Sequence, residues 1–108
     1  MANQFTSYAA KDVGTSPVTL VTVASGVQTT IIGLIVANTS ASTITADVYF
    51  TRSAVNYYIA KGATIPVGRT FVAVGGDQKT VLIAGDALKV VTSAATSADV
   101  VASVLNVA

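Results

Sequence analysis

The sequence of 108 residues predicts an all-β protein, a single antiparallel β-sandwich of eight or nine strands. Three observations lead to this prediction. The chain holds 18 Val, 18 Ala and 15 Thr residues, and β-branched residues favour strands over helices. Short strand-like runs recur about every ten residues. Glycine, proline, asparagine or aspartate stands at nearly every junction between these runs, which is typical of a sandwich or barrel.

The first half of the chain contains the clearest strand patterns. Residues 18–24 follow the turn at 14–17 and are apolar on both faces. Residues 28–37 change from polar to continuously apolar, which predicts a central strand covered on both sides. In residues 43–52 apolar and polar residues alternate, so this strand should bury one face. The residues expected to face inward are Ile44, Ala46, Val48 and Phe50.

The second half predicts shorter strands separated by glycine turns. They are expected at residues 57–61, 71–74, 80–83, 88–92 and 99–107. In the last strand Val100, Ala102 and Val104 share one face, and Val101, Leu105 and Val107 lie largely on the other. A strand that is apolar on both faces is either central in its sheet or covered by a second copy, and the pattern leaves both open.

The whole chain, residues 1–108, reads as one domain. Residues 1–13 precede the sandwich proper, and Ala2 to Val13 is a candidate arm that reaches a neighbouring molecule. The sheet topology is open between a jelly-roll-like and an immunoglobulin-like arrangement.

Composition argues against most catalytic chemistry, so we expect no enzyme activity, no cofactor and no metal. Histidine and cysteine are absent, and with them the usual general base and the main zinc ligands. The only carboxylates are five aspartates. Asp77 and Asp86 lie in glycine turns, which aspartate favours. Asp47 and Asp99 fall on strands, where they could pair with Arg52, Lys89 or a neighbouring subunit. The carboxylates are Asp12, Asp47, Asp77, Asp86 and Asp99.

Charge and hydropathy predict a protein surface that is covered by partners. The net charge is +1 without a basic run, so a nucleic-acid partner is not expected. Charged residues make up 10%, against about 25% in typical soluble domains. The longest apolar run, residues 31–37, is far shorter than the ~20 residues of a membrane-spanning helix, so no membrane partner is expected. The alternative to a covered surface is one hydrated by the many Ser and Thr hydroxyls.

Four residues are interface candidates. Arg52 and Arg69 keep their charge and tolerate partial burial against a partner carboxylate. Tyr57 and Tyr58 lie near Tyr49 and Phe50 in the sequence, and aromatic residues pack well between subunits. The tyrosines at 49, 57 and 58 also raise the alternative of a carbohydrate-binding module. Tryptophan, a residue that commonly stacks on sugars in such modules, is absent.

Several short motifs occur along the chain in an order that is typical of a known protein family. An isoleucine-rich strand ends in Asn38. The short motifs that follow it are Tyr57-Tyr58, Pro66-Val-Gly68, Leu82 to Asp86 and Asp99 to Ser103. From about residue 17 onward the chain resembles the small β-sandwich structural proteins of tailed-bacteriophage virions, of the decoration and tail-accessory class, especially those of cyanobacterial phages. The motifs mark fold positions, so the resemblance transfers no site residues.

The resemblance implies a non-enzymatic virion protein, assembled in the host cytoplasm. Our first placement is a decoration or cement protein that bridges major capsid subunits, as a trimer or dimer with several contacts acting together. The alternative is an adaptor or fibre-attachment protein in the tail, neck or baseplate. The host and the symmetry of the oligomer are open.

Overall fold

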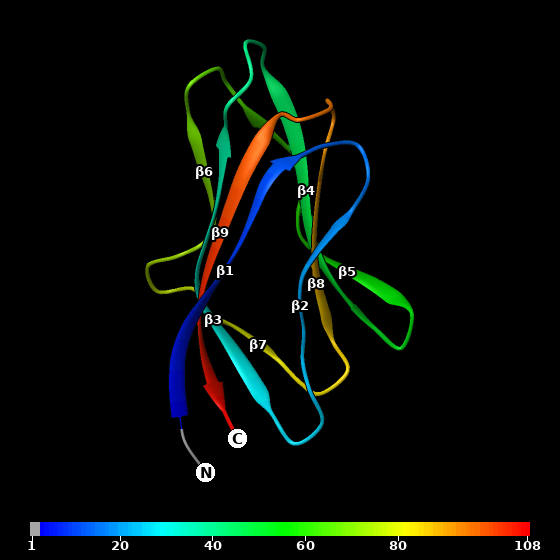
Figure 1. The fold of residues 1–108 in the computed structure, drawn as a ribbon, viewed down its shortest axis with the longest axis vertical. Coiled ribbons are helices and arrows are strands. Elements are labelled where there is room, and N and C mark those ends of the chain that lie inside the picture. Colours follow the sequence, from blue (N-terminus) through cyan, green and yellow to red (C-terminus); the bar gives the residue numbers. More distant parts are fainter. Residues whose placement is uncertain (1–2) are drawn as a thin grey trace.

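The computed structural model describes residues 3–108, which form two antiparallel sheets packed face to face (Figure 1). The all-β sandwich prediction is confirmed. The five-stranded sheet lies on the left of Figure 1 and the four-stranded sheet on the right. The strands are β1 (Asn3–Val13), β2 (Val18–Thr22), β3 (Gln28–Asn38), β4 (Ile44–Arg52), β5 (Val55–Ile65), β6 (Thr70–Val74), β7 (Thr80–Leu82), β8 (Ala87–Thr92) and β9 (Ala98–Val107).

The order of the strands is that of a jelly roll. The first sheet runs β1-β9-β3, and β6 and β7 both pair with the remaining edge of β3, at Leu34–Ala37 and Thr29–Ile31 respectively. The second sheet runs β2-β8-β4-β5. Because β1 and β2 lie in different sheets, the immunoglobulin arrangement, in which the first two strands share a sheet, does not apply.

The core lies between the two sheets, where the inward faces of the strands meet. Ile44, Ala46 and Val48 are buried as predicted, and Phe50 is partly buried against the core. On the other side of the core, Val100 and Val104 of β9 are buried side chains of the five-stranded sheet. Burying one such side chain contributes about 1.5–3 kcal/mol. The largest fully buried side chains are Ile31, Leu34, Ile44, Ile65, Leu82, Leu88, Val13, Val36, Val48, Val90, Val100 and Val104.

The two central strands of the five-stranded sheet bury only one face. Residues 28–37 were expected to be covered on both sides, and that expectation is wrong within this chain. The inner face of β3 is buried, but Ile35 on its outer face is exposed. β9 is central, between β1 and β3, yet Val101 is exposed as well. A central position satisfies the backbone hydrogen bonds of a strand on both edges but does not cover its outer side chains.

The described part of the candidate arm belongs to the sandwich. Residues 3–13 form β1, which pairs with β9 from Asn3↔Val107 to Val13↔Ala98. They therefore do not precede the sandwich, as the sequence suggested, but form one edge of it. Residues 1 and 2 lie outside the described range, so the structure does not describe the first residue of the arm, Ala2.

The β4–β5 hairpin is tighter than the sequence predicted. β5 starts at Val55 rather than Tyr57, and Arg52 pairs with Val55 across a two-residue turn. Ser53 and Ala54 both have positive φ, 53° and 63°, as a type I′ turn requires. This turn normally carries Asn-Gly, so Ser-Ala gave no turn signal.

Candidate interaction surfaces

The outer face of the five-stranded sheet carries two apolar rows that run across the strands. The cross-strand register defines both. The first row is Phe5, Leu105, Thr30 and Val81. The second row is Ala9, Val101, Ile35 and Val72. We call these eight residues the apolar face.

The apolar face has exposed side chains on each of the five strands that it crosses. Phe5 is 74% exposed on β1, and Val72 and Val81 are 57% and 50% exposed on β6 and β7. Val101 and Ile35, on the two central strands, are 40% and 37% exposed. Isolated exposed apolar residues are normal on a protein surface, but two rows that each cross the whole sheet indicate a contact surface, although a row of Ser7, Ser103 and Gly33 separates them.

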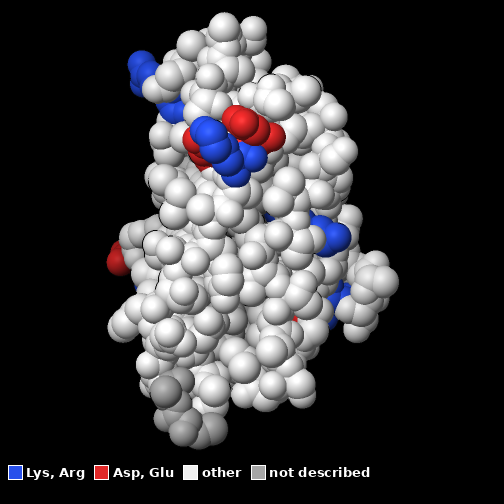
Figure 2. Space-filling model, viewed as in Figure 1, with Lys and Arg blue, Asp and Glu red and all other residues white. Residues whose placement is uncertain are grey.

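Charge is absent from both rows, and a pair of charged groups lies at one end of this face. There the Lys11 ammonium lies 3.5 Å from the Asp99 carboxylate. Figure 2 shows charged atoms in a few separate groups on the side in view, with wide uncharged surface between them. A partner that covered the apolar face would therefore not have to desolvate a charged group.

The outer face of the four-stranded sheet is different, because an ion pair lies in its middle. The Lys61 ammonium lies 3.2 Å from Asp47 Oδ2, and the Gly62 amide donates to Asp47 Oδ1 at 2.7 Å. The hydrogen bond to Asp47 raises the pKa of Lys61. The Lys61 ammonium also lies 4.7 Å from the centre of the Tyr58 ring. This face is suited to contact with water.

The aromatic residues of the β4–β5 hairpin divide between its two faces. Tyr58 packs on Tyr49 with ring centres 5.1 Å apart, and Tyr57 stacks on Phe50 at 5.4 Å. Tyr49 is buried, whereas Tyr57 and Tyr58 are about half exposed. The tyrosines at 49, 57 and 58 thus do not form one flat platform, and the geometry does not favour the carbohydrate-binding alternative.

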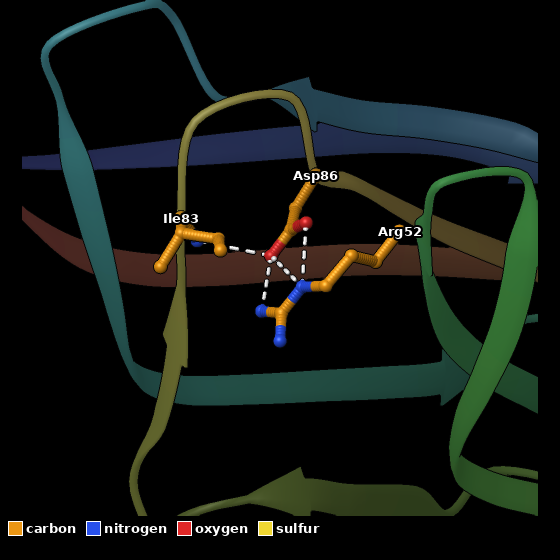
Figure 3. A network of polar contacts seen from close by, with 3 residues as sticks. All are labelled: Arg52, Ile83 and Asp86. Atoms are coloured by element: carbon orange, nitrogen blue, oxygen red, sulfur yellow. Dashed lines mark hydrogen bonds and ion pairs between the residues drawn. The ribbon is translucent and has the colours of Figure 1, made fainter.

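The Arg52 guanidinium pairs with a carboxylate of the same chain, that of Asp86. Its Nη2 donates to Asp86 Oδ2 at 2.6 Å, and its Nε donates to Asp86 Oδ1 at 2.9 Å (Figure 3). The Ile83 amide donates to the same carboxylate at 2.9 Å. The hydrogen bond from Arg52 lowers the pKa of Asp86, against the opposing effect of burial. Arg52, an interface candidate from the sequence, is thus partly exposed and bound to a carboxylate of its own chain.

The four sequence candidates do not form one surface. Arg52, Tyr57 and Tyr58 gather at the β4–β5 hairpin, which projects from the right of Figure 1. Arg69 follows the other end of β5, where Ile65 pairs with Ile44. Its main chain holds the loop there, since the Arg69 amide donates to the Pro66 carbonyl and the Arg69 carbonyl accepts from the Asn38 amide.

The aspartates on strands have partners that differ from those expected. Asp47 pairs with Lys61 and Asp99 with Lys11, rather than with Arg52 or Lys89. Asp86 lies in a turn, as predicted, but sequence reasoning missed its ion pair because the two residues are 34 positions apart. The apolar face was also missed as a unit. The sequence feature that pointed to it was the second apolar side of residues 99–107, formed by Val101, Leu105 and Val107.

Two adjoining hollows open at the end of the sandwich where the C-terminus lies. Their volumes are about 440 and 270 Å³, and both are lined in part by Val27 and Ala108. Three polar side chains that line the smaller hollow are joined by hydrogen bonds. Thr29 Oγ1 donates to Asn106 Oδ1 at 2.6 Å, and Asn106 Nδ2 donates to the Tyr8 hydroxyl at 3.3 Å. These contacts explain how Thr29 is buried at little cost.

The described residues offer neither a metal centre nor a membrane helix. In residues 3–108, no three aspartates come close enough to hold a metal ion. The same range contains no helix of the length and hydropathy needed to cross a membrane. Comparisons of the chain with protein-family models, with curated proteins and with solved structures gave no match.

Proposed function

We propose that this chain is a non-enzymatic structural protein of a bacteriophage virion, a capsid decoration protein that bridges major capsid subunits. The observation that carries the proposal is the apolar face, which residues 3–108 leave exposed. The sequence motifs that resemble virion proteins of tailed phages support the same assignment. The jelly-roll strand order is compatible with it, since this fold is frequent in viral capsids, but folds alone do not define functions.

The size of the outer sheet face that carries the apolar face fits a protein contact. Its four strand positions at a spacing of about 4.8 Å, over the length of a ten-residue strand, cover about 600 Å². A stable interface buries about 800 Å² on each partner. One such face accounts for most of a standard interface, and repetition of the contact around a shell subunit would strengthen attachment through multivalency.

Binding to phage particles that lack the protein tests the proposal. Val101→Lys and Ile35→Lys each place a charge in the centre of the apolar face, where it would have to be desolvated in a contact. We expect either variant to reduce particle binding at least tenfold. Thr45→Lys, on the exposed outer side of β4, is the matched control and should bind like the wild type. Equal binding by all four proteins would refute the apolar face as the docking surface.

Copy number on intact particles separates the capsid from the tail assembly. A decoration protein occurs in proportion to the shell subunits and is spread over the whole shell. A tail, neck or baseplate adaptor occurs in a small set at a single vertex. Quantitative gel analysis with labelling of intact particles decides between them, and absence from purified particles would contradict the virion assignment itself.

A further inference from the structure

The four edges of the two sheets differ in how well they are protected from pairing with another chain. A free edge exposes unpaired amides and carbonyls, and proteins usually protect it with charges, bulges, proline or short strands. β5 carries Lys61 and the positive-φ residue Gly62, and its register with β4 shifts twice. β2 has five residues and a register shift, and the edge opposite β1 is divided between the short strands β6 and β7. Three edges therefore carry known protective devices.

The fourth edge, β1, lacks these devices over most of its length. Residues 3–10 pair with β9 in unbroken register from Asn3↔Val107 to Ala10↔Val100. This stretch contains neither proline nor a charged residue, and its first register shift comes only after Ala10. An uncharged and regular edge of this length is a template for another strand.

We propose that β1 pairs antiparallel with β1 of a second copy of this chain, about a two-fold axis at Ser7. The two five-stranded sheets then join into one continuous sheet across the dimer. Each Phe5 lies opposite Ala9 of the other copy, and the two Ser7 residues lie opposite each other. Side chains that are directly opposite point to the same side of a sheet, so the outer faces of both copies stay on one side.

Two features favour a second copy as the occupant of this edge. A two-fold contact requires a surface that complements itself, and an uncharged strand pairs with its own antiparallel image without charge repulsion. The pairing is also continuous with the apolar face, because Phe5 belongs to the first row and Ala9 to the second. Dimerisation would thus double the apolar face on one side of the assembly. This benefit rests on the proposed function, whereas the pairing itself does not.

Cysteine cross-linking tests the pairing directly, because the natural chain has no cysteine. Opposite residues of an antiparallel pair have Cα atoms about 4.5–5.5 Å apart, which suits a disulfide. The Ser7→Cys variant should form a covalent dimer under mild oxidation. Ser103→Cys is the matched control, since Ser103 is exposed on β9 directly beside Ser7 and on the same face. It should remain monomeric on a non-reducing gel.

Lysine at the same two positions gives a second measurement, by analytical ultracentrifugation. Ser7→Lys sets two ammonium groups opposite each other and should weaken dimerisation at least tenfold. Ser103→Lys should leave it unchanged. Loss of the dimer in both variants would instead indicate packing through the apolar face. A wild-type protein that stays monomeric at high concentration, or cross-linking at residue 103 rather than 7, would overturn the proposal.

A particle-binding measurement distinguishes failure of the β1 edge pairing from failure of the proposed virion function. If Ser7→Cys cross-links but the dimer does not bind particles, the edge pairing stands and the virion function fails. If the protein binds particles as a monomer, the function stands and the edge pairing fails. Circular dichroism of each variant confirms that the substituted chain is folded.

Discussion

The Arg52 guanidinium and the Asp86 carboxylate join the end of β4 to the turn between β7 and β8, with Nη2 and Oδ2 2.6 Å apart. Asp86 is 1% exposed, so its charge depends on this contact. Its main chain takes part as well, because the Asp86 carbonyl accepts from the Val23 amide at 2.9 Å. One residue therefore holds three segments of the chain together at this end of the sandwich.

Asp86→Asn should destabilise the fold while keeping the shape of the side chain. The neutral amide weakens the charge-assisted bonds from Arg52 and the Ile83 amide, and such bonds are each worth about 1.5–3 kcal/mol. We expect a loss of about 2–3 kcal/mol in the free energy of unfolding, measured with urea at pH 7. Asp77→Asn is the control, since Asp77 lies exposed in a turn, and it should change stability by less than about 0.5 kcal/mol. Equal effects would contradict the role assigned to Asp86.

Acid should remove the contribution of this ion pair. Arg52 holds the pKa of Asp86 below its ordinary value, so the unfolded chain takes up a proton at higher pH than the folded chain. The stabilisation is therefore complete above the unfolded pKa of about 3.9 and declines as pH falls below it toward the folded pKa. The stability difference between wild type and Asp86→Asn should be constant above about pH 5 and shrink in stronger acid. A difference that persists unchanged in acid would show that the carboxylate charge is not involved.

The type I′ turn should gain stability from glycine. Ala54 adopts a φ of 63°, which costs an L-residue about 1–2 kcal/mol relative to glycine. Glycine loses part of this gain through its larger entropy in the unfolded chain. Ala54→Gly should therefore raise stability by about 0.5–1 kcal/mol in thermal unfolding. Ala60→Gly, within β5, is the control and should lower stability. A destabilised Ala54→Gly variant would argue against the turn as described.

Asn38 should be among the most sensitive polar positions. Its Nδ2 donates to the carbonyls of Ser42 at 2.8 Å and Ile65 at 3.0 Å, and its Oδ1 accepts from the Ser40 amide at 2.9 Å. Asn38→Ala leaves buried groups without partners, at about 1–3 kcal/mol for each. We expect a loss of at least about 2 kcal/mol in urea unfolding, and less than half of that for Ser40→Ala. Similar losses in both variants would place the stabilisation in the loop rather than in Asn38.

Particular elements show how far sequence reasoning reached. The alternation in residues 43–52 predicted β4 and its inward residues, because a half-buried strand must change face at every residue. The N-terminal segment was misjudged, since its first ten residues are uncharged and suit an arm as well as an edge strand. The β4–β5 turn was missed because Ser-Ala adopts a conformation that local propensity disfavours.

Composition and periodicity determined the all-β class, the strand pattern and the scarcity of charge, because these depend on side-chain properties that act locally along the chain. The jelly-roll order, the Arg52–Asp86 pair and the alignment of Phe5, Leu105, Thr30 and Val81 into one row were decided only by the tertiary structure. Each depends on contacts between residues far apart in the chain, and their register follows from packing of the whole sandwich.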